Sequence, residues 1–208
     1  MRCFPQTRPN QKALAMRQAT MLAPQPDSDR DERQLVERAR THSDAYAELY
    51  LYHVAAVFSY LRTYTSSEED AADLTQHVFL RAFEALPNYR GQEASFRTWL
   101  FRIARNAATD RFRRQRCTLP WDHVPESVHP RSPSDPEATV LHREALTQVH
   151  LAVAQLSPEK QELLALRFAA GLSSTEIAAL VGRSPAAVQK ELVRIMHFLR
   201  EQFHDAAE

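Results

Sequence analysis

The chain has 208 residues, of which 44% are hydrophobic and 25% charged, with a formal net charge of zero; this allows one large domain or two small ones. With 3 glycines against 12 prolines it lacks the residues for tight hairpins and phosphate-binding glycine loops, which favours an all-α fold. Cys3 and Cys117 have no partner at metal-ligand spacing, and neither a secretory signal nor a membrane-length apolar run is present. We expect a soluble, cytoplasmic protein with reduced thiols.

The N-terminal half of the chain predicts a disordered tail followed by a small helical domain. Residues 1–30 are rich in Pro, Gln, Arg and Asp and show no sustained periodicity. Apolar residues then recur at spacings of three and four through residues 31–116. They predict four helices: a short one after Asp31, a longer one over 43–64, a third capped near Ser67 and a fourth from Ser95 to about Gln115.

A proline-rich segment separates this domain from a second one. Residues 117–137 contain five prolines and mostly acidic charges, so they predict an extended linker. Residues 138–208 predict four further helical segments. The first carries an apolar stripe over 141–156, and the second begins at Ser157-Pro158 and ends at Gly171.

The last two segments predict a helix-turn-helix. Ser173 and Glu176 cap a short helix, Gly182 lies in a tight turn, and Ser184-Pro185 begins a longer helix. In this motif the second helix enters the DNA major groove. An ordinary helical hairpin is the alternative. The open face of the second helix would comprise Ala186, Ala187, Gln189, Lys190, Val193, Arg194 and His197.

The fourth helix of the first domain is strongly basic. Its guanidinium groups suit phosphate and base-edge contacts, although a basic helix can also be a solvated face. Most of its aromatic residues fall on one side and are expected in the core. The arginines are opposed by Asp110 alone and comprise Arg97, Arg102, Arg105, Arg111, Arg113, Arg114 and Arg116.

The preceding helix is acidic. Glu69, Asp73 and His77 are spaced at i, i+4 and i+8, the arrangement of a metal site on one helix face. No second helix offers a matching acidic cluster, so a polar face for docking a protein partner fits better. We therefore expect no metal, no cofactor and no catalytic residue.

Two stretches resemble a known family. AADLTQHVFLRAFEAL, followed by FRTWLFRIARNAATDRFRR, resembles the second conserved region of extracytoplasmic-function (ECF) sigma factors, a subfamily of the sigma-70-type subunits of bacterial RNA polymerase. LSPEKQELLALRFAAGLSSTEIAALVGRSPAAVQ is similar to their fourth region. The resemblance covers about residues 31–116 and 138–204. It implies a promoter-recognising polymerase subunit that is not itself an enzyme, works at the nucleoid in holoenzyme, and is held by an anti-sigma factor.

The resemblance also implies roles for individual residues. The acidic helix would bind the clamp helices of the largest core subunit through Asp73, Gln76, His77, Phe79 and Leu80. The promoter −10 element would be recognised and melted by Asn88, Tyr89, Arg90, Arg102, Arg105, Asn106, Arg111, Arg113 and Arg114. The −35 element would be contacted by Ser184, Ala187, Gln189, Lys190 and Arg194.

The second helix of the helix-turn-helix departs from the family pattern. Ala186-Ala187 stands where Gly-Thr is usual, and Gln189-Lys190-Glu191 replaces a Lys-Ser-Arg-like triplet. Glu191 would repel phosphate if it faced DNA, or could accept a hydrogen bond from a cytosine amino group. Two alternatives stay open: a helix-turn-helix regulator that acts without polymerase, and a helical metal-dependent hydrolase.

Overall fold

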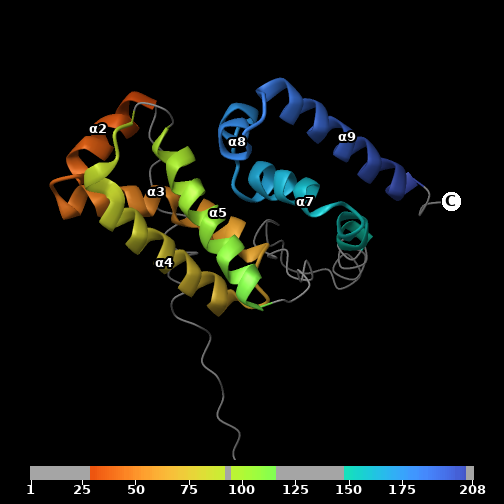
Figure 1. The fold of residues 1–208 in the computed structure, drawn as a ribbon, viewed down its shortest axis with the longest axis horizontal. Coiled ribbons are helices and arrows are strands. Elements are labelled where there is room, and N and C mark those ends of the chain that lie inside the picture. The colour runs from red at the N-terminus through yellow and green to blue at the C-terminus, as the bar shows by residue number, and fades with distance from the viewer. Residues whose placement is uncertain (1–28, 92–94, 116–147, 205–208) are drawn as a thin grey trace, which may run out of the picture.

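The computed structural model describes residues 29–91, 95–115 and 148–204, and within these ranges every regular element is helical (Figure 1). The all-α prediction is therefore confirmed. The predicted linker and residues 1–28 of the predicted tail lie outside the described residues, as does the first part of the helix expected over 141–156. Residues 29 and 30, which were predicted to belong to the tail, are helical.

Four helices form an N-terminal bundle. They are α2 (Asp29–Ala39), α3 (Ser43–Arg62), α4 (Glu68–Ala85) and α5 (Phe96–Gln115), with a short 3-10 turn, η1 (Leu86–Asn88), after α4. Each helix packs on the next along the chain, and α3 also contacts α5. Their apolar stripes meet in a core whose most buried members include Leu49, Val54, Val57, Tyr60, Leu61, Val78, Leu100 and Phe101.

The helix starts in this bundle follow from local hydrogen bonds that the sequence predicts. Ser67 Oγ accepts a hydrogen bond from the amide of Asp70 at 3.0 Å and so caps α4. Ser95 Oγ accepts one from the amide of Thr98 at 3.2 Å at the start of α5. Each cap satisfies an amide that the first turn of a helix leaves without a partner.

The C-terminal bundle contains a helix over residues 148–154, then α7 (Pro158–Leu164), η4 (Ala165–Ala169), α8 (Ser174–Val181) and α9 (Pro185–His204). The segment η4 continues α7 as one wider π-helical turn, and Gly171 follows it at φ +66°. The core of this bundle is built from Leu163, Leu166, Leu172, Ile177, Val188 and Ile195.

The two bundles lie side by side (Figure 1). Helix α5 stands at their boundary and contacts α8, while α3 contacts η4. The basic helix of the first bundle therefore lies next to the second bundle. Among the described residues, no helix has both the length and the apolarity needed to cross a lipid bilayer.

Candidate nucleic-acid and protein interface

The exposed side of α4 carries a mixed polar and apolar surface. Asp73, Gln76, His77 and Leu80 are all exposed, and Leu80 keeps 56% of its surface accessible. Their spacing of i, i+3, i+4 and i+7 places them on one face of the helix. Four of the five residues predicted to bind the polymerase core therefore share one exposed stripe.

Phe79, the fifth, lies elsewhere. It is 4% exposed, and its ring packs edge-to-face on Tyr50 at 4.7 Å. The expectation of a surface contact by Phe79 is corrected: the side chain joins α4 to α3 in the core, because position 79 falls on the buried stripe with Val78 and Ala82.

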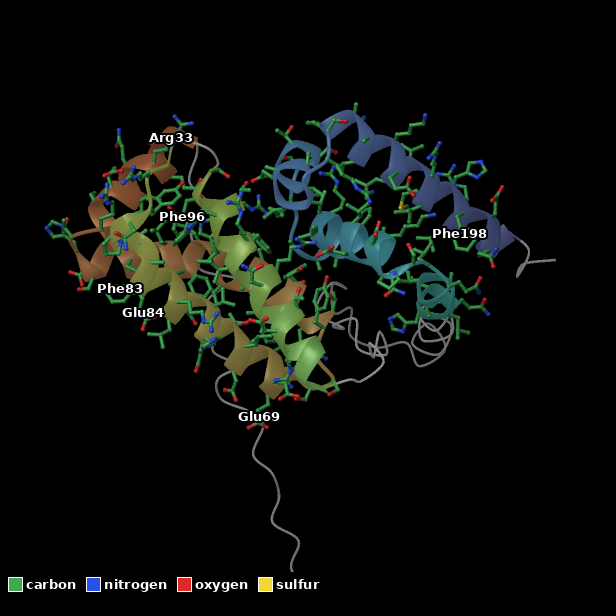
Figure 2. The ribbon with its side chains drawn as sticks, viewed as in Figure 1. Arg33, Glu69, Phe83, Glu84, Phe96 and Phe198 are labelled. Atoms are coloured by element: carbon green, nitrogen blue, oxygen red, sulfur yellow. The ribbon has the colours of Figure 1, made fainter. Side chains whose placement is uncertain are left out.

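Phe83 also belongs to this surface, although neither the sequence pattern nor the resemblance assigned it there. It is 47% exposed, lies three residues after Leu80, and meets the ring of Tyr46 at 4.9 Å. Figure 2 shows it beside Glu84 at the end of α4 that lies far from Glu69. The helical spacing from Asp73 and Gln76 would have predicted it. We call Asp73, Gln76, His77, Leu80 and Phe83 the α4 stripe.

The alternative hypothesis of a metal site on α4 requires several ligands that lie close together. The described residues do not provide such a group. No group of three or more His, Cys, Asp or Glu side chains comes together there at a distance suited to a metal ion. Glu69, Asp73 and His77 lie on successive turns of α4, and no other described element adds a ligand beside them.

The loop between α4 and α5 presents two exposed residues around a packed aromatic one. Asn88 and Arg90 are exposed. The Tyr89 ring, in contrast, lies 5.0 Å from Trp99 and 5.9 Å from Phe96, and burial raises its pKa. Tyr89 thus holds the loop against the first turn of α5, while residues 92–94 lie outside the described part.

The predicted DNA-contacting residues on α5 differ in what they touch. Arg102 and Asn106 are exposed. Arg105 forms two hydrogen bonds to Glu162 of α7, from Nε at 2.6 Å and from Nη2 at 3.1 Å. These bonds raise the pKa of the guanidinium.

Near the end of α5, Arg111 Nη2 lies 2.8 Å from Asp70 Oδ1 on α4. It thus joins two helices of the N-terminal bundle. The predicted phosphate contacts Arg113 and Arg114 lie outside the residues whose side chains the structure describes.

The helix-turn-helix prediction is confirmed in its local geometry. Ser173 and Glu176 form a reciprocal capping box at the start of α8. Gly182 ends that helix at φ +69°, a left-handed conformation that favours glycine. Ser184 Oγ then accepts a hydrogen bond from the amide of Ala187 at 3.2 Å at the start of α9. The buried stripe of α9 contains Val188, Leu192, Ile195 and Leu199.

The residues predicted to contact the −35 element lie together on the open side of α9 and at its start. Ser184, Ala187, Gln189, Lys190 and Arg194 are all exposed. One uncharged amide and two cations among them provide donors suited to base edges and phosphates. The helix therefore presents a polar and basic face.

Glu191 lies beside this face and is mostly covered by neighbouring side chains. Its side chain is 20% exposed, and its carboxylate lies 3.4 Å from Lys160 of α7 and 3.4 Å from Arg194. The negative charge is thus offset by two solvent-accessible cations, Lys160 of α7 and Arg194 on the open face of α9. These ion pairs reduce the repulsion that Glu191 would exert on phosphate.

The chain matches two family models in the order of the two bundles. Residues 49–118 match Sigma-70 region 2, and residues 146–199 match Sigma-70, region 4. The first match contains α4 and α5, and the second contains the helix-turn-helix.

Curated relatives agree with these matches. The chain is 33% identical over 178 residues to the ECF RNA polymerase sigma factor BldN of Streptomyces coelicolor, covering 84% of this chain and 66% of that protein. It is 30% identical over 172 residues to the RNA polymerase sigma-H factor of Pseudomonas aeruginosa, covering 78% of this chain and 89% of that protein. The chain therefore spans just under two thirds of the first relative and most of the second.

Solved structures share the fold. CnrH, solved in complex with the cytosolic domain of CnrY, superposes with a TM-score of 0.61 at 25% identity, over 85% of this chain and 99% of CnrH. The sigma factor RpoE, solved with the anti-sigma factor NepR from Bartonella quintana, gives a TM-score of 0.55 at 21% identity, over 76% and 96% of the two chains, and supports the fold alone. With both regions present in one chain, the protein belongs to the ECF subfamily of sigma-70-type RNA polymerase sigma factors.

Proposed function

We propose that this protein is an alternative sigma factor that binds the RNA polymerase core and directs it to specific promoters. The observation that carries the proposal is the presence of regions 2 and 4 in one chain. We assign residues 31–116 to region 2, 117–137 to an extended linker, 138–208 to region 4, and 1–30 to an N-terminal tail. The protein then acts as a regulatory subunit in the cytoplasm, and the core supplies catalysis.

The α4 stripe is the proposed contact with the clamp helices of the largest core subunit. Leu80 and Phe83 offer exposed apolar surface, whose burial supplies a favourable free energy. Asp73, Gln76 and His77 add polar groups one and two turns away, which fix the orientation of the partner. An apolar centre with a polar border is the usual anatomy of a protein interface.

The −10 element is the proposed ligand of the α4–α5 loop and of α5. A base turned out of the DNA stack needs edge contacts, which the exposed Asn88 and Arg90 can provide beside the aromatic cluster of Tyr89. Arg102 and Asn106 lie on the exposed side of α5, where a guanidinium and an amide can contact phosphates and base edges. Binding free energy at these contacts would offset the cost of unstacking.

The −35 element is the proposed ligand of α9. Gln189 and Lys190 stand one turn from the start of the helix, the end that enters the major groove in helix-turn-helix proteins. Arg194 follows one turn later, and Ser184 caps the start. Glu191 is paired with both Lys160 and Arg194, which offsets its negative charge beside this face.

We also propose an anti-sigma factor as an inhibitory partner. The support comes from a protein of the same fold: RpoE was solved with the anti-sigma factor NepR. Such a partner would cover the α4 stripe or the DNA-contacting faces.

The distinguishing experiment compares DNA selection with and without polymerase. Sheared genomic DNA is incubated with the tagged protein alone, and in parallel with the protein plus purified core, and the bound fragments are sequenced. A sigma factor enriches a shared pair of sequence elements when core is present and little without it. Equal enrichment in both arms would instead indicate a regulator that acts without polymerase.

A further inference from the structure

Helix α2 lies against the loop that is proposed to bind the −10 element, although the sequence pattern assigns it no role there. The Sigma-70 region 2 match begins at residue 49, after α2 has ended at Ala39. Figure 2 shows Arg33 of α2 and Phe96 of α5 at the same end of the N-terminal bundle, and the two helices are in contact. Residues 87–90, between α4 and α5, are called the −10 loop below.

Arg40, which directly follows α2, connects this helix to the backbone of the −10 loop. Its Nη2 donates a hydrogen bond to the carbonyl oxygen of Pro87 at 3.2 Å. That carbonyl lies in η1, at the end of the helical segment that continues α4, where the last carbonyl groups of a helix lack amide partners. The partial negative charge at such a helix end favours a cation. Glu37, one turn earlier on α2, lies 3.0 Å from Arg40 Nη1 and orients the guanidinium.

This hydrogen bond bears directly on the placement of Asn88. The Pro87 carbonyl and the Asn88 amide belong to one planar peptide unit, so a donor that holds the carbonyl oxygen also fixes how the chain enters Asn88. On the other side, the amide of Tyr89 donates to the carbonyl oxygen of Leu86 at 3.0 Å. The backbone of the −10 loop is therefore held both before and after Asn88.

A second support reaches the −10 loop through the core. Glu32 of α2 lies 3.0 Å from Nε2 of His53 on α3, and the two side chains are only 14% and 8% exposed. The His53 ring lies 5.4 Å from the ring of Phe96, and Phe96 in turn meets Tyr89 edge-to-face at 5.9 Å. The loop thus has two supports, one at its backbone and one at its aromatic side chain, and both begin on α2.

Base capture depends on such support. A base that leaves the DNA stack is stabilised by the contacts that the protein offers, and a loop that must first be ordered loses part of that binding free energy. Asn88 and Arg90 are both exposed. Their own neighbours therefore hold them little, and their placement depends on the backbone that carries them.

We propose that α2 supports the −10 loop and that Arg40 is a positioning residue for promoter melting: by holding the Pro87 carbonyl, it places Asn88 and Arg90 for contact with the base that leaves the stack. Arg40 acts through the loop and not by touching DNA. The role in melting rests on the proposed function, whereas the support of the loop does not. Recognition of the −10 element thereby depends on a helix that precedes the residues matched to region 2.

The first experiment measures the −10 loop in the free protein, without DNA or polymerase. Hydrogen exchange of the Tyr89 amide, followed by nuclear magnetic resonance, reports how often its bond to Leu86 opens. Arg40→Ala should lower the protection of this amide by about fivefold, the loss expected for one hydrogen bond. Arg40→Lys keeps a donor and should restore most of the protection. Arg38→Ala is the matched control, because Arg38 lies on the same helix and pairs with Glu48 of α3.

Two outcomes of the exchange experiment would overturn the support by Arg40. The first is equal protection of the Tyr89 amide in Arg40→Ala and Arg38→Ala. The second is a fall of equal size at the Asp70 amide, which is bonded to Ser67 at the start of α4, because this would indicate a general loss of stability.

The second experiment measures promoter melting by the holoenzyme. The probe is a genomic fragment recovered in the selection with core polymerase, and permanganate, which oxidises unpaired thymines, reports the opened −10 region. At saturating holoenzyme, Arg40→Ala should slow opening by about two- to fivefold while core affinity stays within about twofold. Arg40→Lys should recover the rate, and Arg38→Ala should keep it.

An unchanged opening rate in Arg40→Ala, once its loop has lost protection, would refute the role of Arg40 in melting. If the unsubstituted protein opens no fragment, the proposed function fails and the role in melting fails with it. The exchange result still decides in that case whether Arg40 supports the −10 loop.

Discussion

Leu80 provides a direct test of the α4 stripe. Fully burying a leucine side chain contributes about 1.5–3 kcal/mol, and Leu80 has 56% of its surface still to bury. Truncation to alanine leaves part of that surface in place, so Leu80→Ala should weaken binding to the polymerase core by about 1 kcal/mol, or roughly fivefold. The free energy of unfolding should change by less than about 0.5 kcal/mol, because the side chain is exposed and contributes little to the core.

Leu51→Ala is the matched control for this prediction. Leu51 is 42% exposed on α3 and lies outside the α4 stripe, so its truncation removes a similar apolar surface. Affinity is measured by fluorescence anisotropy of labelled protein titrated with purified core, at fixed salt. The reasoning predicts weaker binding for Leu80→Ala and unchanged binding for Leu51→Ala. Equal affinities for both variants and the unsubstituted chain would refute the α4 stripe as the docking surface.

Three other substitutions separate the remaining proposals. Ser173→Ala removes the capping box of α8 and should lower the free energy of unfolding by about 1 kcal/mol in urea titrations, whereas an unchanged midpoint would contradict the capping role. Arg102→Ala should reduce promoter-dependent transcription at saturating protein, while its affinity for the polymerase core stays within about twofold. A loss of core affinity would indicate that Arg102 contacts the polymerase instead of the −10 element. Lys190→Ala should lower the salt slope of promoter binding by holoenzyme by about 1, and an unchanged slope would contradict a phosphate contact by Lys190.

Sequence signals that act over one helical turn predicted the structure well. The caps at Ser67, Ser95 and Ser173 each place a hydroxyl beside the amide three residues on, and this geometry depends on neighbouring residues alone. Gly182 in the turn of the helix-turn-helix is equally local, because its backbone conformation excludes most other residues. Such signals fix where helices begin and end.

Predictions that depended on packing between helices were less complete. The resemblance assigned Phe79 to the contact surface, but its ring packs on Tyr50 of α3 and is buried in the core. The direction of Glu191 likewise depends on Lys160 of α7, a helix distant in sequence. A single helix pattern carries no information on which neighbour will supply the countercharge.

The contact between Arg105 and Glu162, which joins the two bundles, could not be predicted from the sequence. The resemblance to the family assigned Arg105 to DNA, and nothing in its basic helix indicates Glu162, 57 residues further along the chain. Its partner is set by how two bundles, joined through a proline-rich segment, come to lie against each other. Local propensities and apolar stripes do not encode that placement.

The central claim, that this chain is a promoter-directing subunit of RNA polymerase, is tested most directly by transcription in a purified system. Core polymerase is supplied with a pool of genomic fragments, with and without the protein, and the 5′ ends of the transcripts are sequenced. The account predicts discrete start sites that appear with both components present, each preceded by a shared −10 and −35 pair. Transcript 5′ ends that do not change when the protein is added to active core would contradict it.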